Sequence, residues 1–138
     1  MKKKNCICEF ASERSELLLR NFRESIARQS VISRQKAFRE AVEAPAPRFW
    51  VSEARAMRII SSLFTGIDIT EGMRPEKRRM YHEIFRRVKE IKEKNPQTPL
   101  GDIVFEVVNN EAPHSYISWQ SAAKLVSKFK RSRLCKRL

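Results

Sequence analysis

The sequence predicts an all-α protein, and three observations support this fold class. The 138 residues include only three glycines and six prolines, so few residues oppose helix formation. Apolar side chains recur at spacings of three and four residues in six segments, as expected for helices that bury one face. In addition, a stretch that contains two such patterns joined by a turn occurs twice.

The duplicated stretch spans residues 37–64 and 103–130, which align without a gap at an offset of 66 positions. Seven positions are identical, whereas unrelated segments of this length would share roughly two. The identical pairs are Glu40/Glu106, Val42/Val108, Ala46/Ala112, Pro47/Pro113, Ser52/Ser118, Ala56/Ala122 and Ser61/Ser127. We interpret the pattern as two tandem copies of one three-helix, helix-turn-helix-like unit.

The first unit contains several helix start and stop signals. Ser12 and Ser52 are expected N-caps, because each precedes a helical apolar pattern. Pro45 and Pro47 are expected to end the second helix, since proline cannot continue the backbone hydrogen bonds. The helices predicted from these signals span residues 12–29, 34–44 and 53–64.

The second unit has equivalent signals. Pro75 suits the first turn of a helix, Asn95-Pro96 ends that helix, and Thr98-Pro99 begins the next. The valines within residues 103–108 favour a strand, but the matching residues of the first copy are good helix formers, so we expect a helix here too. The predicted helices span residues 75–94, 99–110 and 119–133.

The length suits one compact domain or two small ones packed together. Gly66, Asp68 and Gly72 mark the best candidate for a linker between two units. The predicted organisation is a basic N-terminal arm (1–11), a first unit (12–65), a linker (66–73), a second unit (74–134) and a basic tail (135–138).

The net charge of +13 and the pI of about 10.2 favour a polyanion or an acidic protein as the partner. Each third of the chain is positive, so the charge belongs to the folded body rather than to one tail. The most one-sided region is the last helix and the tail, because no acidic residue follows Glu111.

In the duplicated units, the start of each third helix would face a groove of double-stranded DNA, and its N-terminus could accept a phosphate. Arginine and lysine would supply phosphate contacts. His114, Gln120 and Ser121, or the shape of the DNA, would supply any sequence selectivity. The candidate DNA-binding residues are Arg48, Ser52, Arg55, Arg58, His114, Ser118, Gln120, Ser121, Lys124, Lys128, Lys130 and Arg131.

The second copy combines an apolar helix, a turn containing His114-Ser115 and a basic helix carrying Ala122 and Lys124. This arrangement resembles the helix-turn-helix class of DNA-binding proteins, and it is similar to the DNA-binding domain of bacterial replication initiators. Its turn is longer than in that class, contains proline and lacks glycine. The small, basic, duplicated layout also resembles accessory proteins of phages and mobile elements. The resemblance implies a non-enzymatic, regulatory or architectural DNA-binding protein.

The sequence offers little for catalysis or for a cofactor. It contains no glycine-rich phosphate loop and no nucleophile elbow, and we expect no enzymatic activity. The two histidines are too far apart to complete a metal site with the cysteines. Cys6, Cys8 and Cys135 are odd in number, and Cys6 and Cys8 are too close for an ordinary bridge, so we expect reduced thiols and no cofactor.

Met1–Lys4 is similar to the start of a signal peptide, but no apolar run follows it. No stretch approaches the length of a transmembrane helix, so we expect a cytoplasmic protein that does not enter membranes. Two other functions remain open. One is a structural or interaction protein, such as a phage assembly component, that binds an acidic protein partner or forms a homo-oligomer. The other is an RNA-binding protein in which Phe49 or Trp119 stacks on bases.

Overall fold

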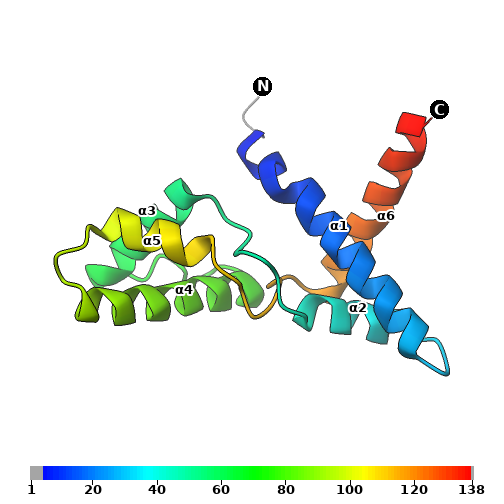
Figure 1. Cartoon of the computed structure of the whole chain (residues 1–138), viewed down its shortest axis with the longest axis horizontal. Coiled ribbons are helices and arrows are strands. Elements are labelled where there is room, and N and C mark those ends of the chain that lie inside the picture. The colour runs from blue at the N-terminus through cyan, green and yellow to red at the C-terminus, as the bar shows by residue number, and fades with distance from the viewer. Residues whose placement is uncertain (1–4, 138) are drawn as a thin grey trace. The chain divides into compact units, whose positions relative to one another are not determined.

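The protein is all-α, as the sequence predicts. A computed structural model describes residues 5–137 of the backbone, and it describes the side chains of residues 10–132. Figure 1 shows the six helices in chain order. They are α1 (Asn5–Arg28), α2 (Arg34–Glu43), α3 (Glu53–Phe64), α4 (Pro75–Lys94), α5 (Leu100–Val108) and α6 (Trp119–Arg137).

The observed bounds of α3 and α4 are those expected from the sequence, and α2 and α5 differ from the expectation by one or two residues at their ends. The predicted N-terminal arm is wrong for residues 5–11, which belong to α1. No proline or glycine interrupts residues 5–28, so the helix continues through Ser12, which is exposed and caps nothing. Residues 135–137 of the predicted tail extend α6. Residues 1–4 and 138 lie outside the described part of the chain.

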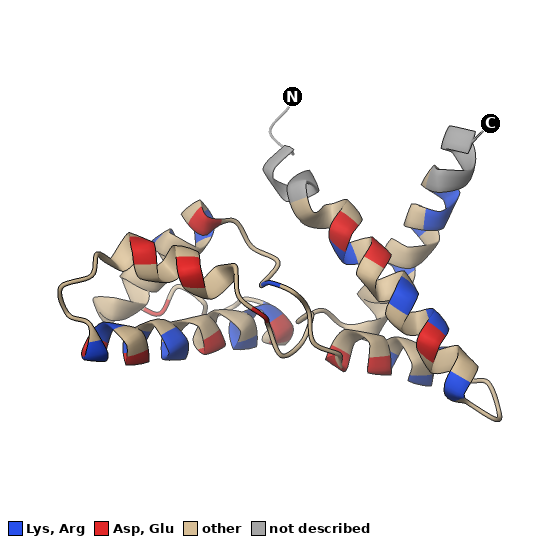
Figure 2. Cartoon of the chain, in the orientation of Figure 1, with Lys and Arg blue, Asp and Glu red and all other residues tan. Residues whose placement is uncertain are grey.

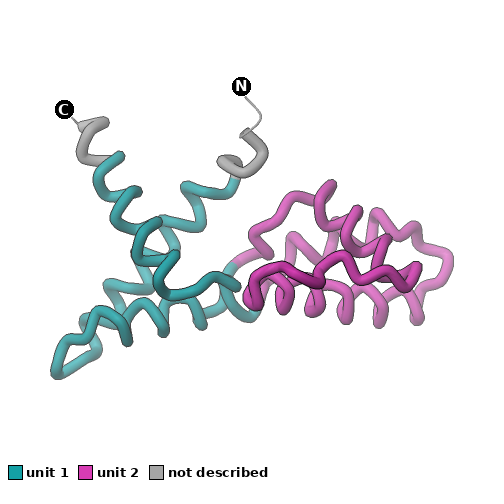
Figure 3. The backbone as a smooth tube through the Cα atoms, turned by 180° about the vertical axis from the view of Figure 1, so that it is seen from behind, with its two compact units in different colours: residues 1–46, 113–138 teal, residues 47–112 magenta. Residues whose placement is uncertain are grey.

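The chain divides into two compact units, but they are not the consecutive segments that we expected. Unit 1 consists of residues 1–46 and 113–138, and unit 2 consists of residues 47–112 (Figure 3). Helices α1, α2 and α6 therefore pack in unit 1, and helices α3, α4 and α5 pack in unit 2. Each third helix packs with the first two helices of the other predicted repeat. The segment 66–73 joins α3 to α4 within unit 2 and is not a linker between units.

The core of unit 1 draws apolar side chains from all three of its helices. Phe22 of α1 stacks on Phe38 of α2, with ring centroids 4.2 Å apart and planes inclined by 20°. The small side chain of Ala122 lets α6 approach this core closely. The buried cluster contains Leu18, Leu19, Phe38, Ala41, Val42, Ala122 and Val126. Unit 1 is thus completed by residues from both ends of the chain.

The core of unit 2 also draws apolar side chains from all three of its helices. Residues 103–108 are helical, and the buried face of α5 carries Ile103, Val104, Val107 and Val108. Their branched side chains fill the space against α3 and α4, so packing outweighs their strand propensity. The facing residues include Ala56, Ile59 and Ile60 of α3 and Met80, Tyr81, Ile84 and Val88 of α4.

A polar cluster holds the loop between α3 and α4 against the start of α4. The carboxylate of Asp68 accepts hydrogen bonds from the backbone N–H of Thr70 at 3.0 Å, from the Thr70 hydroxyl, and from Nη2 of Arg78 at 3.0 Å. The Thr70 side chain is buried, and its oxygen also accepts from Nε of Arg78 at 3.3 Å and lies 3.2 Å from Nε2 of His82. These contacts fix the loop, in which Gly66 and Gly72 adopt positive φ.

This cluster makes stability depend on pH. The Thr70 hydroxyl and the Arg78 guanidinium lower the pKa of Asp68 from 3.8 to about 2. A carboxylate with a lowered pKa in the folded state stabilises the fold above its ordinary pKa, and this contribution is lost as the pH falls through the folded value. We therefore expect Asp68→Asn to lower the thermal unfolding midpoint at neutral pH, with the difference from the unchanged protein shrinking between about pH 4 and pH 2.

Circular dichroism melts across this pH range measure the effect. Glu71→Gln is the matched control, because Glu71 is an exposed carboxylate of the same loop that forms no ion pair among the described side chains. A difference between Asp68→Asn and the unchanged protein that stays constant from neutral pH to pH 2 would contradict the prediction.

Candidate nucleic-acid interface

The exposed face of α6 carries a stripe of side chains that suit a nucleic acid. Gln120, Lys124, Lys128 and Arg131 are all exposed and follow one another at intervals of four, four and three residues. At 100° per residue they fall within an arc of roughly 80° on the helix surface. We call these four residues the α6 stripe. The opposite face of α6 is buried through Ala122 and Val126, so core packing fixes the direction in which the stripe points.

The positive charge of the α6 stripe is not neutralised by neighbouring carboxylates. Among the side chains that the structure describes, Lys124, Lys128 and Arg131 form no ion pair, and neither does Lys130, which is exposed at the edge of the apolar face. Helix α4 differs, because Arg86 pairs with Glu83 and Glu90 at 2.7 and 2.9 Å. Figure 2 shows the mixed charges along α4 and the basic residues along α6. Helix α6 is therefore the better candidate for binding a polyanion.

The N-terminus of α6 is capped as the sequence predicts. The Ser118 hydroxyl accepts a hydrogen bond from the backbone N–H of Ser121 at 3.2 Å and donates one to the Ser121 hydroxyl at 3.0 Å. Both serines are half-buried. Their hydroxyls are thus occupied in fixing the start of the helix, and Gln120 is the exposed residue there that can bond a base edge.

His114 is partly exposed, but its ring is held by contacts within the protein. Its Nδ1 lies 2.8 Å from the backbone carbonyl of Glu43, so Nδ1 must carry the proton, since a carbonyl only accepts. The same nitrogen is 3.4 Å from the Glu43 carboxylate, and the imidazole meets the Tyr116 ring edge to face at 5.6 Å. The structure thus gives His114 the role of holding the turn before α6 against the end of α2.

Arg48 is likewise engaged inside its unit. Its Nε donates to the carbonyl of Phe49 at 2.9 Å, Nη1 donates to the side chain of Asn109 at 2.8 Å, and Nη2 donates to the carbonyl of Val51 at 2.8 Å. All three nitrogens of the guanidinium have partners. These hydrogen bonds use three of the five N–H groups of the guanidinium and hold the turn before α3, so we give Arg48 a structural role and centre the candidate interface on α6.

Helix α3 carries a weaker version of the basic face. Ser52 caps it by accepting from the backbone N–H of Arg55 at 3.2 Å. Arg55 and Arg58 are exposed and lie beside the hydroxyl of Tyr81. Burial raises the pKa of that phenol, and a hydrogen bond from Arg55 and the charges of both arginines partly oppose the rise.

The aligned positions of α3 lack two of the cations of the α6 stripe. Lys128 corresponds to Ser62 and Arg131 to Thr65, and the Thr65 hydroxyl donates to the Ser62 carbonyl at 2.8 Å. The two predicted copies therefore present different surfaces, and only α6 carries a continuous basic stripe.

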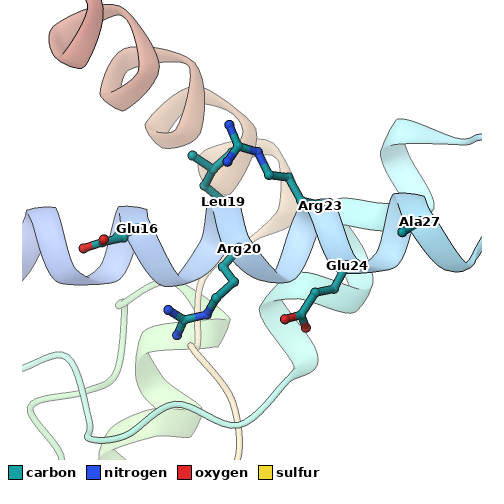
Figure 4. Close-up of a pocket in the computed structure, with 6 residues that line it drawn as sticks. All are labelled: Glu16, Leu19, Arg20, Arg23, Glu24 and Ala27. Carbon is teal, nitrogen blue, oxygen red and sulfur yellow. The ribbon is translucent and has the colours of Figure 1, made fainter. Parts of the chain in front are cut away.

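The middle of α1 adds cations to the surface of unit 1. Arg20 and Arg23 help line an open pocket of about 400 Å³ together with Glu16, Leu19, Glu24 and Ala27. In Figure 4, Leu19 and Arg23 point to the side of α1 where α6 runs, whereas Arg20 and Glu24 point away from it. Leu19 packs in the cluster that contains Ala122 of α6. Arg23 thus flanks α6. Its position one helical turn after the buried Leu19 is the sequence signal that could have placed it beside the buried face of α1.

The two aromatic residues considered for base stacking both pack against apolar side chains, to different degrees. Phe49 is only 1% exposed, and the guanidinium of Arg87 covers its ring at 5.1 Å from the centroid. Trp119 is half-buried and packs against the core cluster of unit 1. Phe49 is therefore closed to a single-stranded base, and the packing of Trp119 against the core leaves only part of its ring open to stacking.

The chain matches no family model, no curated protein and no solved structure. Over the part of the chain that the structure describes, no helix is long and apolar enough to cross a membrane. No three His, Cys, Asp or Glu side chains lie together in a way that could hold a metal ion, within the same described residues. The α6 stripe is thus the feature that argues most directly for a function.

Proposed function

We propose that this protein binds double-stranded DNA through the exposed face of α6. The observation that carries the proposal is the α6 stripe, where one amide and three cations lie in line and no described carboxylate neutralises them. An α-helix fits the major groove of B-form DNA, and lysine and arginine along its length can reach the phosphates on either side.

Within this interface the residues have different roles. Lys124, Lys128 and Arg131 would bind phosphates and supply most of the affinity, with Lys130 and Arg23 as flanking contacts. Gln120 would read a base edge, since an amide can bond both N6 and N7 of adenine. Because Gln120 is the one residue proposed to read a base, recognition would depend mainly on the phosphates and on DNA shape. This suits an architectural or regulatory protein acting in the cytoplasm.

Binding to an acidic protein partner is the second candidate, because the same unpaired cations would attract clustered carboxylates. Its distinguishing property is a partner of defined stoichiometry rather than retention on any DNA. RNA binding through single-stranded stacking has less support, since Phe49 is buried and Trp119 packs against the core cluster of unit 1.

A mobility-shift titration tests the proposal. The protein is titrated against a random-sequence DNA duplex and a single-stranded RNA of equal length at two salt concentrations. If the three cations of the α6 stripe and the two flanking cations each neutralise one phosphate, raising salt from 50 to 200 mM should weaken duplex binding by roughly 500-fold. Duplex retention with this salt dependence supports the proposal. Absence of duplex retention at low salt would refute it.

A further inference from the structure

The two turns that precede α3 and α6 dock in a reciprocal way. The backbone N–H of Phe49 donates to the carbonyl of Val108 at 3.0 Å, and the backbone N–H of Ser115 donates to the carbonyl of Val42 at 3.0 Å. Phe49 aligns with Ser115, and Val42 aligns with Val108, at the offset of 66 positions found in the sequence. The turn of each repeat therefore bonds to the second helix of the other repeat, at the same place.

Side chains of the turns repeat this reciprocity with different chemistry. Arg48 donates to the side chain of Asn109 at 2.8 Å, and His114 contacts the carbonyl and carboxylate of Glu43 at 2.8 and 3.4 Å. Arg48 aligns with His114, and Glu43 aligns with Asn109. In each pair, one residue directly follows the buried valine of a second helix. The other belongs to the other repeat and follows its buried alanine and its proline.

The third helices are alike in the face that they bury. Ala56 and Ile60 of α3 are buried against α4 and α5, and the aligned Ala122 and Val126 of α6 are buried against α1 and α2. Each repeat contributes two helices to one unit and its third helix to the other. Neither repeat contains a complete three-helix core.

We propose that the repeated helix–turn–helix segment, residues 37–64 and 103–130, is a self-recognition module whose partner is a second copy of the same segment. This chain carries both copies, so each copy binds the other within one polypeptide. The proposal concerns assembly and does not depend on DNA binding, so each can fail without the other.

The loop between α3 and α4 offers a direct test. A specific protease site is inserted between Gly66 and Ile67, which are exposed, and the folded full chain is then cleaved. The N-terminal piece keeps α1, α2 and α3, and the C-terminal piece keeps α4, α5 and α6, so both units now need helices from both pieces. We expect the pieces to remain associated one to one, with the mass of the uncut chain by light scattering and unchanged helical circular dichroism.

Separation of the pieces into two folded monomers under native conditions would overturn the proposal, because it would mean that each repeat builds its own core. A second measurement covers the case in which the insertion itself disturbs folding. In the uncut chain, Arg48→Ala, Asn109→Ala and the double variant form a cycle across the two repeats. We expect non-additive effects on the unfolding equilibrium constant of roughly three- to tenfold, whereas additive effects would overturn the proposal.

Discussion

Replacing Lys124 and Lys128 together by alanine is expected to weaken binding to duplex DNA and to flatten its dependence on salt. Both side chains lie on the exposed α6 stripe and form no described ion pair, so they are free to exchange counterions for phosphates. Each phosphate contact contributes about 0.9 to the slope of log affinity against log salt, so the double variant should reduce that slope by roughly two units. Fluorescence anisotropy titrations at four salt concentrations measure both quantities.

The substitution leaves folding intact, because alanine favours helix at least as well as lysine does and both positions are exposed. Lys77→Ala with Lys94→Ala is the matched control, since it removes the same charge from exposed positions at the two ends of α4. A similar loss of affinity in both variants would show that DNA binding depends on the net charge of the protein alone. An unchanged salt slope in the α6 variant would remove Lys124 and Lys128 from the interface.

Most helix bounds could be predicted from the sequence because local signals decide them. Proline at position 75, the proline pair at positions 45 and 47, and the capping Ser52 and Ser118 act through the backbone of one or two turns. All of these signals correspond to the observed ends or starts of helices. Ser12 gave a similar signal and was wrong, because a serine caps a helix only where the preceding chain leaves it, and residues 5–11 contain nothing that ends a helix.

The way in which the helices assemble could not be predicted from the same signals. An apolar stripe shows that a helix face is buried but does not identify the helix that covers it. This ambiguity is greatest where two helices have similar faces, as Ala56 and Ile60 on α3 resemble Ala122 and Val126 on α6. Consecutive packing was the simpler expectation, and the structure instead pairs α6 with α1 and α2.

The same limit applies to the candidate site. Periodicity identified the exposed residues of α6, because their spacing places them opposite a buried alanine and valine. The sequence did not reveal that Arg48 and His114, which we predicted as DNA contacts, hold turns, since their partners Asn109 and Glu43 lie 61 and 71 positions away in sequence. Only the fold reveals that these polar side chains hold turns.

Phe38→Ala is expected to abolish DNA binding although Phe38 lies far from α6 in sequence. Phe38 is 1% exposed, stacks on Phe22, and belongs to the buried cluster that holds Ala122 and Val126 of α6. Removing a buried phenylalanine costs about 3–5 kcal/mol, through lost apolar burial and the cavity that remains. Because α6 has no other core to pack against, the stripe should lose its fixed orientation and affinity should fall sharply.

Hydrogen exchange measured by mass spectrometry locates the effect. In Phe38→Ala the amides of α6 should exchange faster, whereas those of α3 should keep their protection, because α3 belongs to unit 2. The control is Ile84→Ala, which removes a fully buried side chain of α4 at a comparable cost of about 2–5 kcal/mol. In Ile84→Ala the amides of α3 should exchange faster, whereas the protection of α6 and the affinity for DNA should stay unchanged. The reverse pattern, with α6 released by Ile84→Ala, would mean that α4 and α6 share a core, as consecutive repeats require.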